Sequence, residues 1–217
     1  MVRVAGGVSE PYPDRATIEA SAPGPGEILA WMRPEELFFL QIQGSGGLVF
    51  EDGARRRAVF AAHNGRPFVG LARLMRERGL LPDEQTSAAN IKAWLAARRG
   101  PEADALMREN PRYVFFALEP DDGGHPRGAA GVPLPAGRAA AIDPAHHAYG
   151  QVLWIEADAG ALAGAFPRYR RMVAALDTGG AIRGPVRADL YVGRGEAAGT
   201  EAGRIRHALR LWRIVPR

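Results

Sequence analysis

The chain has 217 residues, of which 47% are hydrophobic and 24% charged, and this composition is typical of a soluble globular protein. It contains no cysteine, which excludes disulfide bonds, thiolate metal sites and a lipid-bearing cysteine in these residues. The net charge is +4, but the arginines lie in short scattered runs without the stacking aromatics of a nucleic-acid site, so we expect no nucleic-acid partner.

Glycine and proline are frequent in the chain, with 27 and 17 residues respectively. A helical bundle would not tolerate so many, and the composition instead predicts many turns and short strands. We therefore expect a mainly β fold of the α+β class, with a few helices.

The first elements along the chain are a leading segment, a strand and a turn. Residues 1–30 are rich in proline, glycine and small side chains. Apolar residues then alternate from Phe38 to Ile42, which predicts a strand over 38–43 that Gly44 ends. The Asn-Gly pair at 64–65 predicts a tight turn.

Three helices are expected next, each with recognisable end signals. The first covers residues 71–78. The second is capped by Ser87 and ends before Gly100. The third begins at Pro101, a residue suited to the first helical position, and stops at Asn110 because a proline follows.

Beyond residue 111 the pattern changes to short apolar strands separated by turns. The run Asp121–Gly124 marks a boundary, so we expect a leading segment at 1–19, a second, groove-forming domain at 20–118 and a β module at 119–217. The strands of this part are expected over 113–118, 151–156, 171–176, 188–192 and 209–215.

Three carboxylates, Asp143, Asp177 and Asp189, stand at the ends of apolar strands beside turn residues. A carboxyl group flanked by apolar residues is partly desolvated, which raises its pKa and suits it to act as an acid. A nearby Arg187 or Arg194 would lower that pKa, and the sequence leaves the balance open. All three could equally be turn caps, since Asp commonly bonds backbone N–H groups there.

A second polar cluster follows the first expected strand. Gln41, Gln43, Gly44 and Ser45 offer amides and a hydroxyl suited to the hydroxyl and acetamido groups of sugars, although a structural hairpin end fits the same pattern. The five histidines show no metal-binding spacing, so no metal site is expected.

The tripeptide Asp177-Thr178-Gly179 is also the active-site sequence of aspartic proteases. Those enzymes need two such carboxylates that share a proton. Only one copy occurs in the chain, so this alternative function requires a homodimer.

Eight motifs together resemble one family, and they occur in its order and rough spacing from about residue 11 to the end. The chain resembles the membrane-bound lytic murein transglycosylase A family. The motifs are Pro13–Ala20, Phe38–Gly46, Asn64–Phe68, Asn90–Leu95, Asn110–Phe116, Gly131–Arg138, Asp177–Gly184 and Ala198–Gly199 with Ala202–Arg204.

The resemblance implies a double-psi β-barrel module with a second β-rich domain, and peptidoglycan in the groove between them. It makes Asp143, Asp177 and Asp189 the aspartates of a "three-aspartate" module, with Asp189 as the catalytic acid and the other two as supporting carboxylates. Thr178, Gly179 and Gly180 belong to the motif that would contact substrate.

The reaction implied is cleavage of the β-1,4 bond between N-acetylmuramic acid and N-acetylglucosamine, with formation of 1,6-anhydromuramic acid. Ordinary glycosidases need two carboxyl groups. Here the substrate's own hydroxyl attacks, so one carboxyl group suffices and no cofactor is implied.

The resemblance also implies a monomeric protein of the periplasm or outer membrane. The sequence shows no signal peptide, no lipid-anchor cysteine and no run of transmembrane length. Family members carry a further N-terminal segment that forms part of the barrel, so we expect an incomplete barrel and reduced activity. The alternative from another class is a non-catalytic fragment that binds peptidoglycan.

Overall fold

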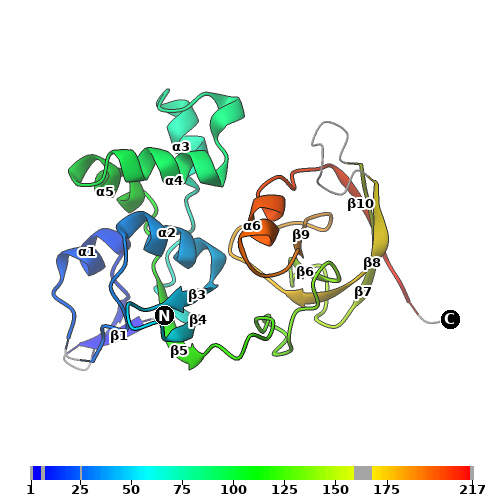
Figure 1. Cartoon of the computed structure of the whole chain (residues 1–217), viewed down its shortest axis with the longest axis horizontal. Coiled ribbons are helices and arrows are strands. Elements are labelled where there is room, and N and C mark those ends of the chain that lie inside the picture. The colour runs from blue at the N-terminus through cyan, green and yellow to red at the C-terminus, as the bar shows by residue number, and fades with distance from the viewer. Residues whose placement is uncertain (1, 6–7, 25, 159–167, 216–217) are drawn as a thin grey trace. The chain divides into compact units, whose positions relative to one another are not determined.

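A computed structural model of the chain describes residues 2–5, 8–24, 26–158 and 168–215 (Figure 1). The chain divides into two compact units, the first from Met1 to Asp122 and the second from Gly123 to Arg217. Each unit contains one main β-sheet, with several helices in the described part of the first unit and α6 in that of the second, so the predicted mainly β fold with a few helices is confirmed. No helix among the described residues is long and apolar enough to cross a membrane.

In its described residues, the first unit has an antiparallel sheet in the order β3-β4-β5, accompanied by five α-helices and a small hairpin. The sheet strands are β3 (Ser45–Val49), β4 (Arg55–His63) and β5 (Val114–Pro120). The other elements are β1 (Val2–Ala5), β2 (Val8–Pro11), α1 (Arg15–Ala20), α2 (Pro34–Gln43), α3 (Leu71–Glu77), a 3-10 turn η1 (Asp83–Gln85), α4 (Ala88–Ala97) and α5 (Pro101–Arg108).

The three predicted helices correspond to α3, α4 and α5, and their end signals act as expected. The Ser87 hydroxyl accepts a hydrogen bond from the backbone N–H of Asn90, and Pro101 opens α5. These helices bury one apolar cluster together with α2. Its buried members are Phe38, Leu71, Met75, Ile91, Trp94, Leu95, Ala103, Leu106 and Met107.

The predicted strand over 38–43 is wrong, because these residues form the second half of α2. Proline at the first helical position, two acidic residues in the first turn and Gly44 at the C-cap with φ of 80° all favour a helix. Phe38 and Gln41, three residues apart, share its buried face, whereas Ile42 is exposed. Ser45 begins the next strand, β3.

A buried arginine connects distant segments of the first unit. Arg15, in the first turn of α1, is only 2% exposed and donates hydrogen bonds to the carbonyls of Asn110 and Arg112 and to the Gln41 side chain. Its guanidinium also lies 4.9 Å from the ring centroid of Phe38. Arg15 therefore anchors α1 to the interior of this unit.

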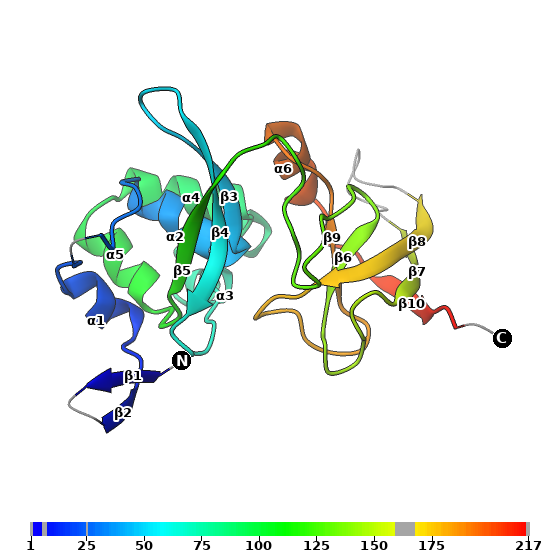
Figure 2. The same ribbon diagram turned by 90° about the horizontal axis from the view of Figure 1, so that it is seen from below.

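The second unit has a five-stranded sheet in the order β10-β7-β8-β6-β9. All its pairs are antiparallel except β6 with β8. The strands of this sheet do not lie in one plane but curve strongly (Figure 1 and Figure 2). The elements are β6 (Ala139–Ile142), β7 (Val152–Asp158), β8 (Arg168–Asp177), β9 (Ala188–Tyr191), α6 (Glu196–Ala202) and β10 (Leu209–Arg213).

The strands predicted for this unit are confirmed with small changes at their ends. Alternation explains the packing of the sheet, since Leu153 and Ile155 are buried whereas Val152 on the opposite face is 40% exposed. Among the described residues β10 and β9 pair with one neighbour each, so the double-psi closure of the sheet stays a prediction.

Candidate active site

The candidate site lies around the short strand β6 of the second unit. Asp177, the last residue of β8, and Asp189, the second residue of β9, are both register partners of Ala141. The β8 ladder shifts at this point, so that Leu176 is passed over and Asp177 lies opposite Ala141. With adjacent strands about 4.8 Å apart, the two aspartates stand roughly 10 Å apart at the backbone, on either side of β6.

Asp189 is held by a neighbouring guanidinium. Arg187 Nε lies 2.7 Å from Oδ1 of Asp189 and Arg187 Nη2 lies 3.2 Å from Oδ2, which makes a two-point pair. The Asp189 side chain is 49% exposed. The prediction of a desolvated carboxyl group is therefore wrong for this residue. Of the two arginines considered, Arg187 is the partner, whereas Arg194 donates to the Gly124 carbonyl.

Asp143 follows the end of β6 and is buried, with 6% of its surface exposed. Its carboxylate accepts the backbone N–H of Gly184 at 2.8 Å and that of Ala145 at 3.1 Å. These two hydrogen bonds lower the pKa of Asp143 more than burial raises it, with a smaller lowering from Arg183. Here the turn-cap interpretation holds, and the expected raised pKa is wrong.

Asp177 and Thr178 connect the end of β8 to neighbouring segments. Asp177 Oδ1 accepts the backbone N–H of Ala129 at 3.0 Å. The Thr178 hydroxyl donates to the carbonyl of Ile142, the last residue of β6, at 2.9 Å. Asp177 therefore holds the segment at Ala129, and Thr178 holds the end of β6, the strand paired with β9.

The glycines Gly179 and Gly180 follow these residues in a turn at the end of β8. The Gly179 carbonyl accepts the backbone N–H of Ile182 at 3.0 Å, and Gly180 is exposed. Of the two, Gly180 is thus the more accessible to a ligand.

The predicted sugar-binding residues Gln41, Gln43, Gly44 and Ser45 belong to the first unit. The Gln41 amide is buried and satisfied within the protein, since it donates to the Val114 carbonyl at 3.0 Å and accepts from Arg15 at 2.6 Å. Gln43 is exposed at the end of α2, and Gly44 and Ser45 are half-buried. The structure therefore places Gln41 in the interior rather than on a surface that a sugar can reach.

Sequence reasoning missed the contact between Tyr191, the last residue of β9, and His125. Tyr191 follows Asp189 by two residues, so alternation puts both side chains on one face of the sheet. Its hydroxyl lies 3.0 Å from Nδ1 of His125, and the two rings meet edge to face. The Asp-x-Tyr spacing could have indicated Tyr191. No sequence signal indicates His125, which is 66 positions away.

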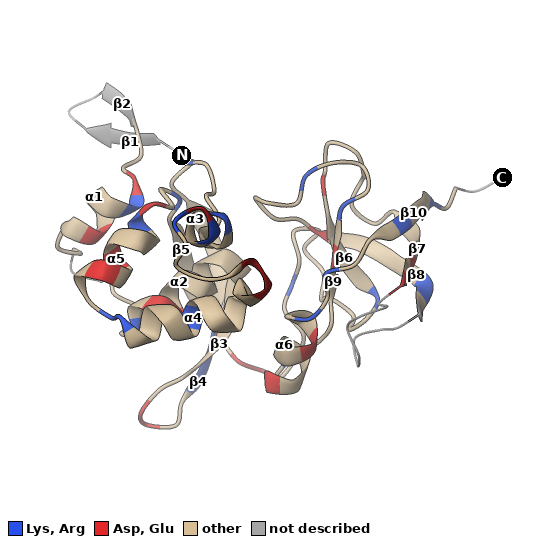
Figure 3. Ribbon diagram, turned by 90° about the horizontal axis from the view of Figure 1, so that it is seen from above, with Lys and Arg blue, Asp and Glu red and all other residues tan. Residues whose placement is uncertain are grey.

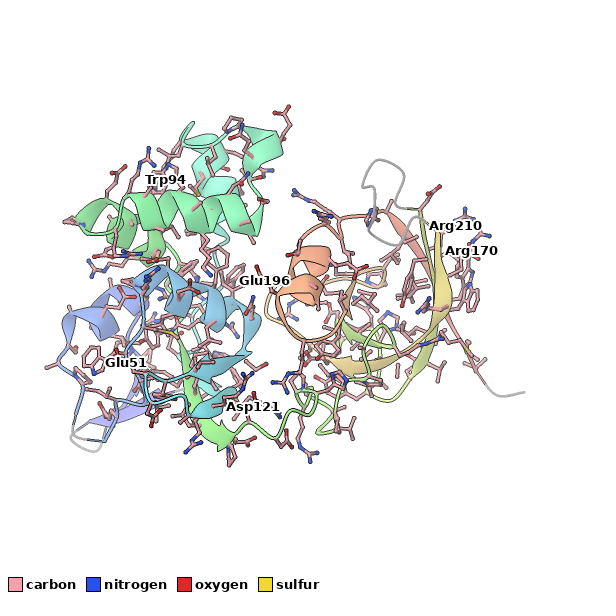
Figure 4. The ribbon with its side chains drawn as sticks, viewed as in Figure 1. Glu51, Trp94, Asp121, Arg170, Glu196 and Arg210 are labelled. Carbon is pink, nitrogen blue, oxygen red and sulfur yellow. The ribbon has the colours of Figure 1, made fainter. Side chains whose placement is uncertain are left out.

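Two shallow hollows of the second unit lie elsewhere. One is lined by residues of α6, including Glu196, and the other by residues of β7, β8 and β10, including Arg170 and Arg210 (Figure 4). Neither hollow is lined by any of the three aspartates. The candidate site around β6 is therefore separate from both hollows.

The electrostatics of the second unit are mixed. Basic and acidic positions are interspersed over it rather than gathered in one stripe (Figure 3). Among the described residues no group of three or more His, Asp or Glu side chains is placed to hold a metal ion. The chemistry that the site offers is proton transfer by an accessible carboxyl group.

Comparison with known proteins finds relatives for both units of the chain. The family profile described as "MltA specific insert domain" matches residues 1–117, and that of the "3D domain" matches residues 138–215. The "Membrane-bound lytic murein transglycosylase A" of Vibrio cholerae is 33% identical over 183 residues, which are 82% of this chain and 48% of that protein. The protein of the same name from Escherichia coli K12 is 33% identical over 204 residues, 92% of this chain and 55% of its own length.

The chain thus spans about half the length of the curated relatives it matches. A solved structure of membrane-bound lytic murein transglycosylase from Agrobacterium tumefaciens matches with a TM-score of 0.90 and 36% identity, over 99% of this chain and 60% of that one. The structure of E. coli MltA with bound chitohexaose matches with a TM-score of 0.82 and 31% identity, over 93% of this chain and 61% of that one. Because the insert-domain profile alone covers more than half of the sequence, the resemblance is confirmed: the chain belongs to the membrane-bound lytic murein transglycosylase A family.

Proposed function

We propose that the chain carries the catalytic site of a peptidoglycan lytic transglycosylase, with Asp189 as the single catalytic carboxyl group. The bond cleaved is the β-1,4 linkage between N-acetylmuramic acid and N-acetylglucosamine. The family supports the reaction class, and the relative solved with chitohexaose supports a glycan ligand. The observation that carries the assignment is that Asp189 is the most accessible of the three aspartates and shares its sheet row with Asp177.

The mechanism needs one proton and no water. Asp189, when protonated, donates its proton to the glycosidic oxygen as the bond from that oxygen to C1 of the muramic acid breaks. The resulting carboxylate then takes the proton of the C6 hydroxyl, whose oxygen bonds to C1 and closes the 1,6-anhydro ring. An attacking group already held in the same sugar has a large proximity advantage over water.

The other two aspartates act on the framework of this site. Asp177 fixes the segment around Ala129, and Asp143 clamps the turn at Gly184 to the end of β6. β6 pairs with β9, the strand that carries Asp189, so the Asp143 contact holds the end of the strand on which the position of Asp189 depends. Asp143 and Asp177 are therefore proposed as positioning residues.

The test is mass spectrometry of purified peptidoglycan digested by the wild type and by Asp189→Asn. We expect anhydro-muropeptides from the wild type and at least about 100-fold less from the variant, the usual scale for removal of a general acid. Asp83→Asn is the matched control, because Asp83 is an exposed carboxylate of the first unit. Reducing-end products without the anhydro ring would refute the mechanism.

A second candidate is a non-catalytic domain that binds peptidoglycan. One observation favours it: Arg187 engages both carboxylate oxygens of Asp189. It predicts sedimentation with insoluble peptidoglycan without release of soluble fragments, and no effect of Asp189→Asn on either. Since the relatives are named membrane-bound, we place the protein in the periplasm or at the outer membrane as part of this proposal.

A further inference from the structure

Arg187 and Asp189 form a pair that conflicts with the proposed chemistry. The guanidinium offers two N–H groups and both oxygens of the carboxylate accept one, at 2.7 and 3.2 Å. This geometry suits an ionised carboxylate, which accepts hydrogen bonds at both oxygens. A carboxyl group that is to donate a proton cannot accept two such bonds in the same way. Catalysis therefore requires Arg187 to leave Asp189.

The pair is weakly held and can be exchanged. The side chains are 52% and 49% exposed, so water competes with both partners. Arg187 lies just before β9 and outside any strand or helix, which leaves its long side chain room to turn. Once the Arg187 guanidinium has released one carboxylate, the same two N–H groups can bind another.

The proposed substrate carries such carboxylates. Muramic acid differs from N-acetylglucosamine by a lactyl ether that ends in a carboxyl group, free in peptide-free strands and extended by an acidic peptide otherwise. We propose that Arg187 is a specificity-determining residue that binds a carboxylate of the glycan substrate, and that Asp189 occupies this place when substrate is absent. This inference rests on the proposed function.

The consequence is coupling between recognition and acid chemistry. When a carboxylate of the substrate binds the Arg187 guanidinium, it displaces Asp189, so Asp189 is released only when the glycan is bound. A neutral chitin-type oligomer lacks the competing carboxylate and leaves the pair closed. Arg187 thus favours acidic glycans over neutral ones.

Binding of two soluble probes tests this exchange. The probes are chitohexaose, which is neutral, and a peptide-free hexasaccharide of alternating N-acetylglucosamine and muramic acid with free lactyl carboxylates. Affinities are measured for the full chain by surface plasmon resonance at low temperature with contact times of seconds, so that turnover is negligible. The variants are the wild type, Asp189→Asn, Arg187→Gln, Arg187→Lys and the double variant Asp189→Asn/Arg187→Gln.

Opposite effects are expected for the two partners. Asp189→Asn frees the Arg187 guanidinium and should raise the affinity for the acidic probe by about 10-fold, whereas Arg187→Gln should lower that affinity by about 10-fold. The affinity for chitohexaose should change by less than about 2-fold in both variants. Arg187→Lys restores only part of the affinity, because an ammonium group cannot bind a carboxylate in the forked geometry. The gain from Asp189→Asn disappears in the double variant, since it depends on Arg187.

A matched control removes the same charge elsewhere in the unit. Arg210 lies on β10, at the other edge of the sheet, so Arg210→Gln should leave the affinities for both probes unchanged. The proposal is overturned if Asp189→Asn leaves the acidic probe unaffected, or if its gain survives in the double variant. Turnover of peptidoglycan is measured separately. Absence of anhydro products would contradict the proposed function, whereas the binding data would still test the role of Arg187.

Discussion

Asp177 and Asp189 lie on opposite sides of Ala141, each as its register partner on a neighbouring strand. The residue between the two carboxylates is thus one of the smallest in the protein. A methyl group at this place leaves the face of the sheet open between them. This is the surface on which we place the scissile bond.

Enlarging the central residue should obstruct that surface. Ala141→Leu is expected to lower kcat/KM by at least about 10-fold, because even a small displacement of substrate from the catalytic group is costly. Ala141 is half-buried, so stability should change little. Turnover of peptidoglycan and thermal melting check this, with Ala141→Ser as the control of similar size. A leucine variant that works at the wild-type rate would place the substrate elsewhere.

A second prediction concerns the loop that Asp177 anchors. A Cβ at Gly128 would press against the Leu176 carbonyl oxygen and lie 2.6 Å from Leu134 Cδ2. Gly128→Ala should therefore destabilise the unit by about 2 kcal/mol, as overpacked sites do. It should also lower turnover, because the loop bears the N–H that Asp177 accepts.

Gly199→Ala is the contrasting substitution. Gly199 lies in α6 with nothing within 4 Å of an added Cβ, so this variant should gain about 0.5–1 kcal/mol from helix propensity. Urea unfolding of both variants gives the two free energies. Equal effects of the same sign would contradict the packing seen at Gly128.

A third prediction follows from the lowered pKa of Asp143. A carboxyl group whose folded pKa is below its ordinary value of 3.8 stabilises the fold above that pH, and the contribution is lost as the pH falls through the folded pKa. Asp143→Asn should lower the melting temperature at pH 7, because its amide cannot accept both backbone N–H groups. The difference from the wild type should shrink on acidification to pH 3 and below. Equal differences at both pH values would show that the charge of Asp143 is not the cause.

A fourth prediction tests the buried arginine of the first unit. Arg15→Met should destabilise the protein by about 3 kcal/mol, because buried acceptors such as the Asn110 and Arg112 carbonyls would lose their donor. Arg73→Met is the control, since Arg73 is 70% exposed and its ion pair with Glu77 lies on the surface. It should change the free energy of unfolding by less than about 0.5 kcal/mol. Denaturant unfolding of both variants gives the comparison.

Local signals in the sequence were sufficient where they were strong and agreed with one another. Ser87 and Pro101 marked the starts of two helices, and apolar runs beside turns marked the strands of the second unit. The three aspartates were found at strand ends because a polar residue after an apolar run is visible without tertiary information. These predictions depended only on residues that are close to one another in the sequence.

The errors arose where local signals competed or where contacts are remote. Alternating apolar residues after Phe38 suggested a strand, but packing on α4 and the signals at Pro34 and Gly44 favour a helix. Strand β4 begins with three arginines and was missed for lack of an apolar start. The exposure of Asp189 depends on the path of the chain around Arg187, and that path is set by pairing with β6 rather than by neighbouring residues.

The position of β9 in its sheet has a consequence for how activity would be lost. Within the described part of the chain β9 pairs with β6 alone, so it is an edge strand of four residues. Such a strand can detach without disturbing the remaining ladder, and opening of this kind costs less than global unfolding. Inactivation on warming should then precede melting, because the acid lies on a short strand at an edge of the sheet, where local opening does not require the unit to unfold.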